Sequence, residues 1–130
     1  MAFEIKKAVR ELIWVKVALM SPSGGGKTYS SLRLATGMAR ELGKKMDRKP
    51  KILMGNSEAA RGLYYADEFE YDITPLSSPH HPENYVALIN HAVKEGYDIL
   101  ILDSTSHEWN GKGGCLDLQQ QAGGTYQAWG

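Results

Sequence analysis

The stretch Ser21-Pro-Ser-Gly-Gly-Gly-Lys-Thr28 decides the predicted fold. It follows Val15–Met20, a β-branched and apolar run that predicts a strand. It precedes Thr28–Leu42, which contains no proline, carries apolar residues at spacings of three and four, and stops at Gly43. A glycine-rich loop between a buried strand and an amphipathic helix is typical of a phosphate-binding turn.

The residue types in this loop suit phosphate chemistry. Glycines let successive backbone N–H groups turn toward one point, and the start of the following helix adds further N–H groups and its dipole. Gly26-Lys27-Thr28 completes the pattern G-x-x-x-x-G-K-[ST], in which the lysine reaches the β- and γ-phosphates and the hydroxyl binds Mg²⁺. Ser21 occupies the first glycine position, which we expect to retune affinity without abolishing binding. The predicted nucleotide-binding set is Ser23, Gly24, Gly25, Gly26, Lys27, Thr28 and Tyr29; the alternative is a glycine-rich turn with a solvated lysine.

The rest of the chain alternates between strand and helix patterns. Tyr97–Asp103 has the strongest strand pattern, a continuous apolar run of the kind that a parallel sheet covered on both faces uses. The other expected elements are a buried strand at Ile52–Gly55, a helix starting near Ser57, an exposed strand at Tyr71–Leu76, and helices at Pro82–Glu95 and Cys115–Ala122, with loops at Ser104–Gly114 and Gly123–Gly130. This alternation predicts a single α/β domain over residues 1–130, with a mainly parallel sheet flanked by helices.

A magnesium nucleotide site also needs a carboxylate near the loop. Asp103 follows four apolar residues at the end of a predicted strand and is the candidate metal ligand together with Thr28. Glu58 follows the preceding buried strand, at the sheet edge where ligands bind in open α/β sheets, and is the candidate catalytic base, with Lys27 as the second catalytic residue. The alternative for Glu58 is a place in the first helical turn, with Asn56 or Ser57 as the cap, and Glu108 is a rival base.

Composition sets bounds on the function. The chain has 15 basic and 15 acidic residues and is 42% hydrophobic, which fits a folded domain and excludes a disordered or collagen-like chain. Met1–Gly55 has a net charge of +8 and Asn56–Gly130 a net charge of −8, so the two halves can pair within one molecule or between molecules. A single cysteine, Cys115, which we expect to be buried, and the lack of any apolar stretch of about 18 residues predict a cytoplasmic protein without membrane contact.

Three segments together resemble a known family. Ser21-Pro-Ser-Gly-Gly-Gly-Lys-Thr28, Asn56-Ser-Glu58 and Ile99-Leu-Ile-Leu-Asp-Ser104, in this order, resemble the RecA-like branch of the P-loop ATPases. In that family the catalytic glutamate follows the strand after the first helix, and the strand of the metal site ends in Asp-Ser. Ser21–Ser31 and Asp103–Gly114 are similar, more specifically, to phage-encoded RecA-like ATP-binding proteins.

The resemblance implies binding and hydrolysis of ATP with Mg²⁺, self-association with ATP between subunits, and work on single-stranded DNA during phage recombination or replication. RecA-like ATPases also insert a further strand, carrying a γ-phosphate sensor, between the phosphate-loop strand and the strand that ends at Asp103. No apolar run after Asp103 supplies that strand, so we expect the chain to be the first part of a longer protein. Two rivals remain: a P-loop small-molecule kinase, in which those two strands are direct neighbours, and a nucleotide-binding assembly module that does not hydrolyse ATP.

Other chemically suggestive residues have simpler interpretations. We expect His80 and His81 to be a solvated loop pair, because with His91 they find no second ligand cluster at helical spacing for a metal site. His107 lies in a polar loop and is also expected to be solvated, with a proton relay beside Glu108 as the alternative. The basic run from Lys44 to Lys51 predicts a solvated connection, with contacts to a phosphate backbone as the alternative. Lys112 predicts a flexible turn, with a neighbouring subunit's phosphate or DNA as the alternative. Trp109, Tyr126 and Trp129 can stack on bases, but their acidic surroundings favour a packing role.

Overall fold

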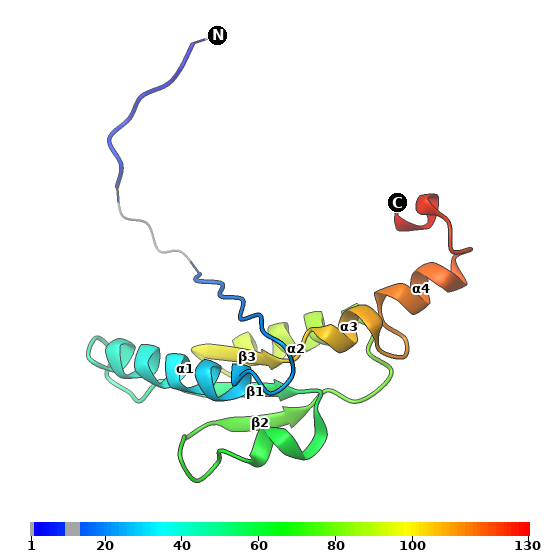
Figure 1. The fold of residues 1–130 in the computed structure, drawn as a ribbon. Coiled ribbons are helices and arrows are strands. Elements are labelled where there is room, and N and C mark those ends of the chain that lie inside the picture. Colours follow the sequence, from blue (N-terminus) through cyan, green and yellow to red (C-terminus); the bar gives the residue numbers. More distant parts are fainter. Residues whose placement is uncertain (1, 10–13) are drawn as a thin grey trace.

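The computed structural model describes residues 2–9 and 14–130. Its secondary-structure elements follow the loop at residues 21–26 (Figure 1). They are α1 (Lys27–Gly43), β1 (Ile52–Asn56), η1 (Ala59–Leu63), β2 (Asp72–Pro75), α2 (Pro82–Lys94), β3 (Ile99–Asp103), α3 (Ser106–Asn110), α4 (Cys115–Gln121) and η2 (Tyr126–Trp129). Within the described residues, no helix is long and apolar enough to cross a membrane.

The sheet is small and entirely parallel. Its three strands lie in the order β2-β1-β3, with Leu53 opposite Asp72 on one side and Leu100 on the other. Helix α1 lies along one face of the sheet and α2 along the other, whereas α3, α4 and η2 extend away beyond the carboxyl end of β3 (Figure 1). The predicted α/β class with a parallel sheet flanked by helices is confirmed.

Alternate residues of β1 supply the two cores. Ile52 and Met54 face α1, where they pack with Leu32, Ala35 and Ala39, and Ile101 of β3 joins this cluster. Leu53 faces the other way and packs with Leu76 and with three residues of α2, namely Tyr85, Leu88 and Ala92. Every residue of β1 is buried, as expected for the central strand of a sheet covered on both faces.

The predicted strand at Val15–Met20 is wrong for this structure. Residues 14–20 form no regular secondary structure, and the side chains of Val15, Val17 and Met20 are exposed. A strand is stabilised by pairing with a neighbour, and this segment pairs with no strand of the described sheet, whose edges are β2 and β3. Its β-branched composition alone therefore does not make it a strand here.

Several other segments also depart from expectation. The helix expected near Ser57 is the short 3-10 helix η1, and the strand at Tyr71–Leu76 is the shorter β2, which is half-buried at its centre because it pairs with β1. The expected loops contain the short helices α3 and η2. Helix α4 confirms the helix predicted from Cys115, but that cysteine is only partly buried.

The basic and acidic halves pair within one molecule. Arg48 donates to both carboxylate oxygens of Asp98, at 2.7 and 2.8 Å, and Lys49 pairs with Glu70. Lys51 donates to the backbone oxygen of Glu95 and lies over the ring of Tyr97. The basic side chains of the connection between α1 and β1 are exposed, as predicted for a solvated connection, and the connection is also tied to the residues that precede β2 and β3.

Gly55 provides a test of the packing between β1 and α2. A Cβ at this position would lie 2.4 Å from Cδ2 of Leu88, so we expect Gly55→Ala to lower the free energy of unfolding by about 1–3 kcal/mol through overpacking. Gly37→Ala is the control, because a Cβ there meets no atom within 4 Å and should raise stability by about 0.5–1 kcal/mol through better helix propensity. Chemical denaturation measures both, and equal stability of the two variants would contradict this packing.

The Arg48–Asp98 pair predicts a dependence of stability on pH. Hydrogen bonds from Arg48 hold the pKa of Asp98 below its ordinary value, although burial opposes this shift. Ionised Asp98 therefore stabilises the fold above the ordinary carboxyl pKa of about 3.9, and this contribution is lost as the pH falls through the lowered pKa of the folded state. We expect Asp98→Asn to lower the melting temperature by a few degrees near neutral pH.

The difference from the unaltered chain should shrink as the pH falls below about 4. Glu41→Gln is the control, because its pair with Lys44 is exposed on both sides and should matter little at any pH. Thermal melts followed by circular dichroism across this pH range make the comparison. A deficit for Asp98→Asn that stays constant with pH would contradict the assignment.

Candidate functional site

The loop at residues 21–26 is built from glycines in a conformation that other residues avoid. Gly24 and Gly26 have φ values of 77° and 78°, in the left-handed region, and Gly26 is the residue that caps α1. The backbone N–H of Gly25 donates to the oxygen of Pro22 at 3.1 Å, which closes a tight turn. A Cβ on Gly25 would lie 2.3 Å from Oγ of Ser21, so the turn also needs glycine at the middle position.

Lys27 folds back over this loop. Its Nζ donates to the backbone oxygens of Ser21 and Pro22, at 2.8 and 3.1 Å, and lies 3.4 Å from the Ser21 hydroxyl. The ammonium group therefore lies beside the turn, at the N-terminus of α1. Its positive charge adds to the positive end of the dipole of this 17-residue helix, an arrangement that attracts anions.

Thr28 and Asp103 meet at the centre of the site. The Thr28 hydroxyl donates to Oδ2 of Asp103 at 2.6 Å, although the two residues are 75 positions apart in the sequence. Asp103 is buried at the carboxyl end of β3, and Thr28 lies in the first turn of α1. The predicted metal ligands are thus brought together, and their hydroxyl and carboxylate oxygens are the donors that Mg²⁺ prefers.

Tyr29 packs beside the loop. Its ring makes edge-to-face contacts with Tyr65 and Phe69, with centroids 5.5 and 5.4 Å apart. These aromatic residues lie in the connection between η1 and β2, so the ring of Tyr29 anchors the start of α1 to that connection. Participation of Tyr29 in nucleotide binding remains a prediction, and its backbone is the part that a ligand at the loop would meet.

The two candidate bases lie on different elements. Glu58 directly follows the turn after β1; its backbone N–H donates to Oδ1 of Asn56 at 3.0 Å, and its carboxylate pairs with Arg61 at 3.3 Å. Asn56 thus bonds the backbone of this turn, but Glu58 is itself the residue that precedes η1, which has no side-chain cap, so the capping alternative is not confirmed. A role of Glu58 as a base remains a prediction. Glu108 lies in α3, and its charge adds to the burial that raises the pKa of Tyr85.

A polar network joins the ends of β1 and β3. The Ser57 N–H donates to the backbone oxygen of Asp103 at 2.7 Å, and the Ser104 N–H donates to Oγ of Ser57 at 2.9 Å. The same Oγ lies 2.8 Å from Nδ1 of His107. The sequence suggests Ser57 only as a helix cap. Its hydrogen-bond partners could not be predicted from the sequence, because they lie about 50 positions away in the chain.

His80 and His107, near this network, are partly buried, whereas the sequence predicts solvated side chains. His80 stacks on His107 with ring centroids 5.0 Å apart, and Nδ1 of His80 is buried without a hydrogen-bond partner among the described residues. Burial lowers the pKa of His80, and the neighbouring His107 lowers it further. The part of the chain that the structure describes contains no group of three or more residues from His, Cys, Asp and Glu that could hold a metal ion.

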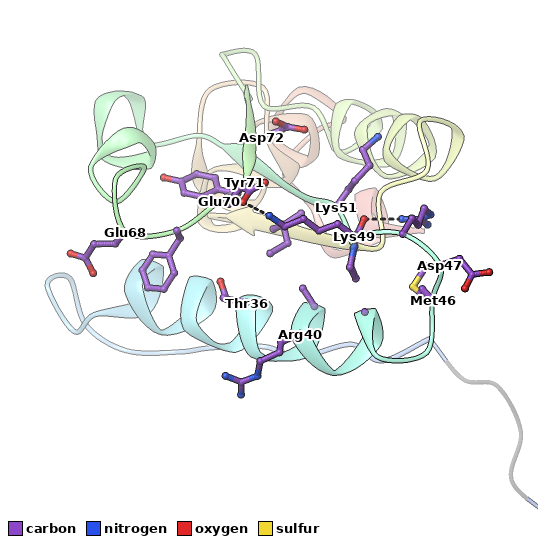
Figure 2. A pocket seen from close by; sticks show the side chains of 16 residues that line it. Thr36, Arg40, Met46, Asp47, Lys49, Lys51, Glu68, Glu70, Tyr71 and Asp72 are labelled. Carbon is purple, nitrogen blue, oxygen red and sulfur yellow. Dashed lines mark hydrogen bonds and ion pairs between the residues drawn. The ribbon is translucent and has the colours of Figure 1, made fainter.

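A cavity of about 880 Å³ lies away from this site. It is bordered by the second half of α1, the connection to β1 and the residues just before β2, at the amino ends of the strands (Figure 2). Lys49 and Glu70 face each other across it and form an ion pair. Because Lys49 and also Arg48 are engaged by acidic partners, the lining gives no support to the alternative of phosphate-backbone contacts by the basic run.

The aromatic residues near the end of the chain form a pair. Trp109 and Trp129 stack with their ring planes 8° apart, and both are about half exposed. Tyr126 lies nearby in sequence and is exposed.

The backbone oxygen of Lys112 accepts a hydrogen bond from the His80 N–H. This bond fixes the backbone of the glycine-rich turn around Lys112 against the loop at residues 77–81.

Comparisons of the chain with protein-family models, with curated proteins and with solved structures find no match. The case for a function therefore depends on the side-chain geometry of the loop, of Thr28 and of Asp103.

The contact between Gly25 and Ser21 predicts a suppressor. We expect Gly25→Ala to weaken ATP binding at least about tenfold, because overpacking of this size forces the backbone to shift. The double variant Ser21→Gly with Gly25→Ala removes both atoms of Ser21 that clash and leaves a contact of 3.0 Å with the Pro22 oxygen, so its loss relative to Ser21→Gly alone should be clearly smaller than the loss that Gly25→Ala causes in the unaltered chain. Fluorescence titration with a labelled ATP compares the variants, and additive losses in the double variant would contradict this geometry.

Proposed function

We propose that the chain binds Mg-ATP at the loop Ser21–Thr28 and acts as a RecA-like P-loop ATPase in phage DNA recombination or replication. The observation that carries the proposal is the 2.6 Å hydrogen bond between Thr28 and Asp103. In a phosphate-binding loop the hydroxyl after the lysine is a ligand of Mg²⁺, and a carboxylate at the end of a nearby strand holds the same ion. The sequence places these groups far apart, and the fold brings them into contact.

The loop supplies the groups that a triphosphate needs. The backbone from Ser23 to Thr28 supports the phosphates, and Lys27 exchanges the oxygens of Ser21 and Pro22 for those of the β- and γ-phosphates. Thr28 and Asp103 would hold Mg²⁺, which when bound neutralises charge on the phosphate oxygens. Both protein ligands are hard oxygen donors, so the residues fit this ion.

Hydrolysis requires a group that orients or deprotonates the attacking water. Glu58 follows β1, the strand next to β3, so it lies at the same edge of the sheet as Asp103. Its pair with Arg61 is partly exposed and weak enough to open when a nucleotide arrives. We therefore assign Glu58 as the base, with Glu108 as the residue to test beside it.

The role in DNA metabolism is supported by the resemblance of the phosphate-loop and Asp103–Gly114 segments to phage RecA-like proteins. Single-stranded DNA and a second copy of the chain are the proposed partners. The exposed stack of Trp109 and Trp129 has the chemistry that single-strand binding uses, because bases stack on aromatic faces. The residues around that stack are acidic and would repel the phosphate backbone of DNA, so DNA binding by the chain is to be measured directly.

Calorimetric titration tests nucleotide binding. We expect micromolar Mg-ATP binding by the unaltered chain, a loss of at least about tenfold in Lys27→Ala, and a loss in Asp103→Asn that appears only when Mg²⁺ is present. Lys45→Ala removes an exposed lysine two residues after the end of α1 and serves as the charge-matched control. A folded, unaltered chain that binds neither ATP nor GTP would overturn the proposal.

Phosphate release, measured with and without single-stranded DNA, then distinguishes three possibilities: a RecA-like ATPase, a small-molecule kinase and an assembly module that does not hydrolyse ATP. DNA-stimulated release that is lost in Glu58→Gln supports the RecA-like ATPase. Transfer that depends on a small-molecule acceptor would favour a kinase, and binding without any release would favour an assembly module.

A further inference from the structure

We propose that Ser57 is a positioning residue that holds Asp103 against Thr28. The proposal deepens the proposed function, because it assigns control of the metal-binding carboxylate to a residue that touches neither nucleotide nor metal. Its structural part concerns the chain alone and can be tested without any ligand.

Ser57 bonds to both polar groups of the peptide that follows the Asp103 side chain, the peptide between Asp103 and Ser104. Its N–H donates to the Asp103 oxygen at 2.7 Å, and its Oγ accepts from the Ser104 N–H at 2.9 Å. The register of β1 and β3 ends with Asn56 opposite Asp103, so these two bonds extend the ladder by one residue just where the functional carboxylate lies. These two bonds hold the peptide after Asp103 in place, and with it the backbone from which the carboxylate reaches Thr28.

The Ser57 hydroxyl is itself held in place. His107 Nδ1 lies 2.8 Å from Oγ, and the Ser104 oxygen lies 3.1 Å from it. A serine hydroxyl has one proton and two acceptor sites, so it can satisfy the Ser104 N–H and one of these two groups with either tautomer of His107. His107 is in turn packed against the ring of His80.

A capping role does not account for these contacts. The 3-10 helix η1 begins after Glu58 and has no side-chain cap, and the Glu58 N–H is bonded by Asn56 instead. The Ser104 hydroxyl does not take over as acceptor for the Ser104 N–H. It is buried and makes no hydrogen bond with the described residues. Loss of the Ser57 hydroxyl would thus leave the Ser104 N–H unpaired beside a carboxylate whose 2.6 Å contact with Thr28 depends on its placement.

The test compares Ser57→Ala, which removes the hydroxyl, with Ser57→Thr, which keeps it. In the nucleotide-free chain, NMR measures the exchange of the Ser104 amide proton and the ¹³C resonance of the Asp103 carboxyl group. We expect Ser57→Ala to speed the exchange at least about tenfold, because the amide loses its acceptor. It should also move the Asp103 resonance in the direction that Thr28→Val moves it, whereas Ser57→Thr should leave both values as they are in the unaltered chain.

The second readout is the ratio of ATP affinities measured with Mg²⁺ and with a chelator. We expect Ser57→Ala to lower this ratio about tenfold without changing the affinity in chelator, because only the metal depends on Asp103. An equal loss under both conditions, or an unmoved Asp103 resonance, would overturn the inference. Failure of the unaltered chain to bind ATP would overturn the proposed function alone, since the resonance and the amide exchange still decide the role of Ser57.

If Ser57→Ala does not fold, Ser57→Cys replaces it, because sulfur keeps the shape but is a weak acceptor. The expected changes then have the same direction and smaller size. A cysteine variant that is folded and leaves both NMR readouts unmoved would overturn the proposal.

Discussion

The hydrogen bond from Thr28 to Asp103 joins the first turn of α1 to the carboxyl end of β3, and the geometry of the whole site depends on it. Without it, α1 would be held by its apolar contacts with the sheet, which fix the distance between helix and sheet more strongly than the position of the helix along its axis. With it, the glycine turn lies at the same sheet edge as Asp103 and the residues that follow β1. One polar contact thus joins the start of the helix to the end of β3.

The parts of the molecule that the sequence predicts well are those decided by near neighbours. The glycines at 24–26, the spacing of Leu32, Ala35 and Ala39, and the unbroken apolar run that ends at Asp103 each encode a local preference, and α1, β1 and β3 begin and end close to the expected positions. The pairing of Thr28 with Asp103 was also predictable, because the chemistry of a magnesium site requires such a pair.

What the sequence could not predict depends on partners that are distant in the chain. Val15–Met20 has the composition of a strand, but strand formation needs a neighbour, and the described sheet does not pair with it. Arg48 looks like one of several solvated cations until the fold brings Asp98 to it from 50 positions away. Ser57 fits a helix cap by residue type, and only the tertiary structure shows its hydroxyl bonded to the residues that follow β3.

The contacts of Lys27 make ligand capture an exchange of partners. Its ammonium group already donates to two backbone oxygens and a hydroxyl, so a phosphate would have to replace these contacts. The free energy that this lysine would contribute to binding is therefore the difference between its contacts with phosphate oxygens and those with the loop oxygens. If the loop binds phosphate as proposed, the same oxygens would compete for the lysine when the ligand leaves, so the contacts that hold Lys27 in the free chain would favour release as well as oppose capture.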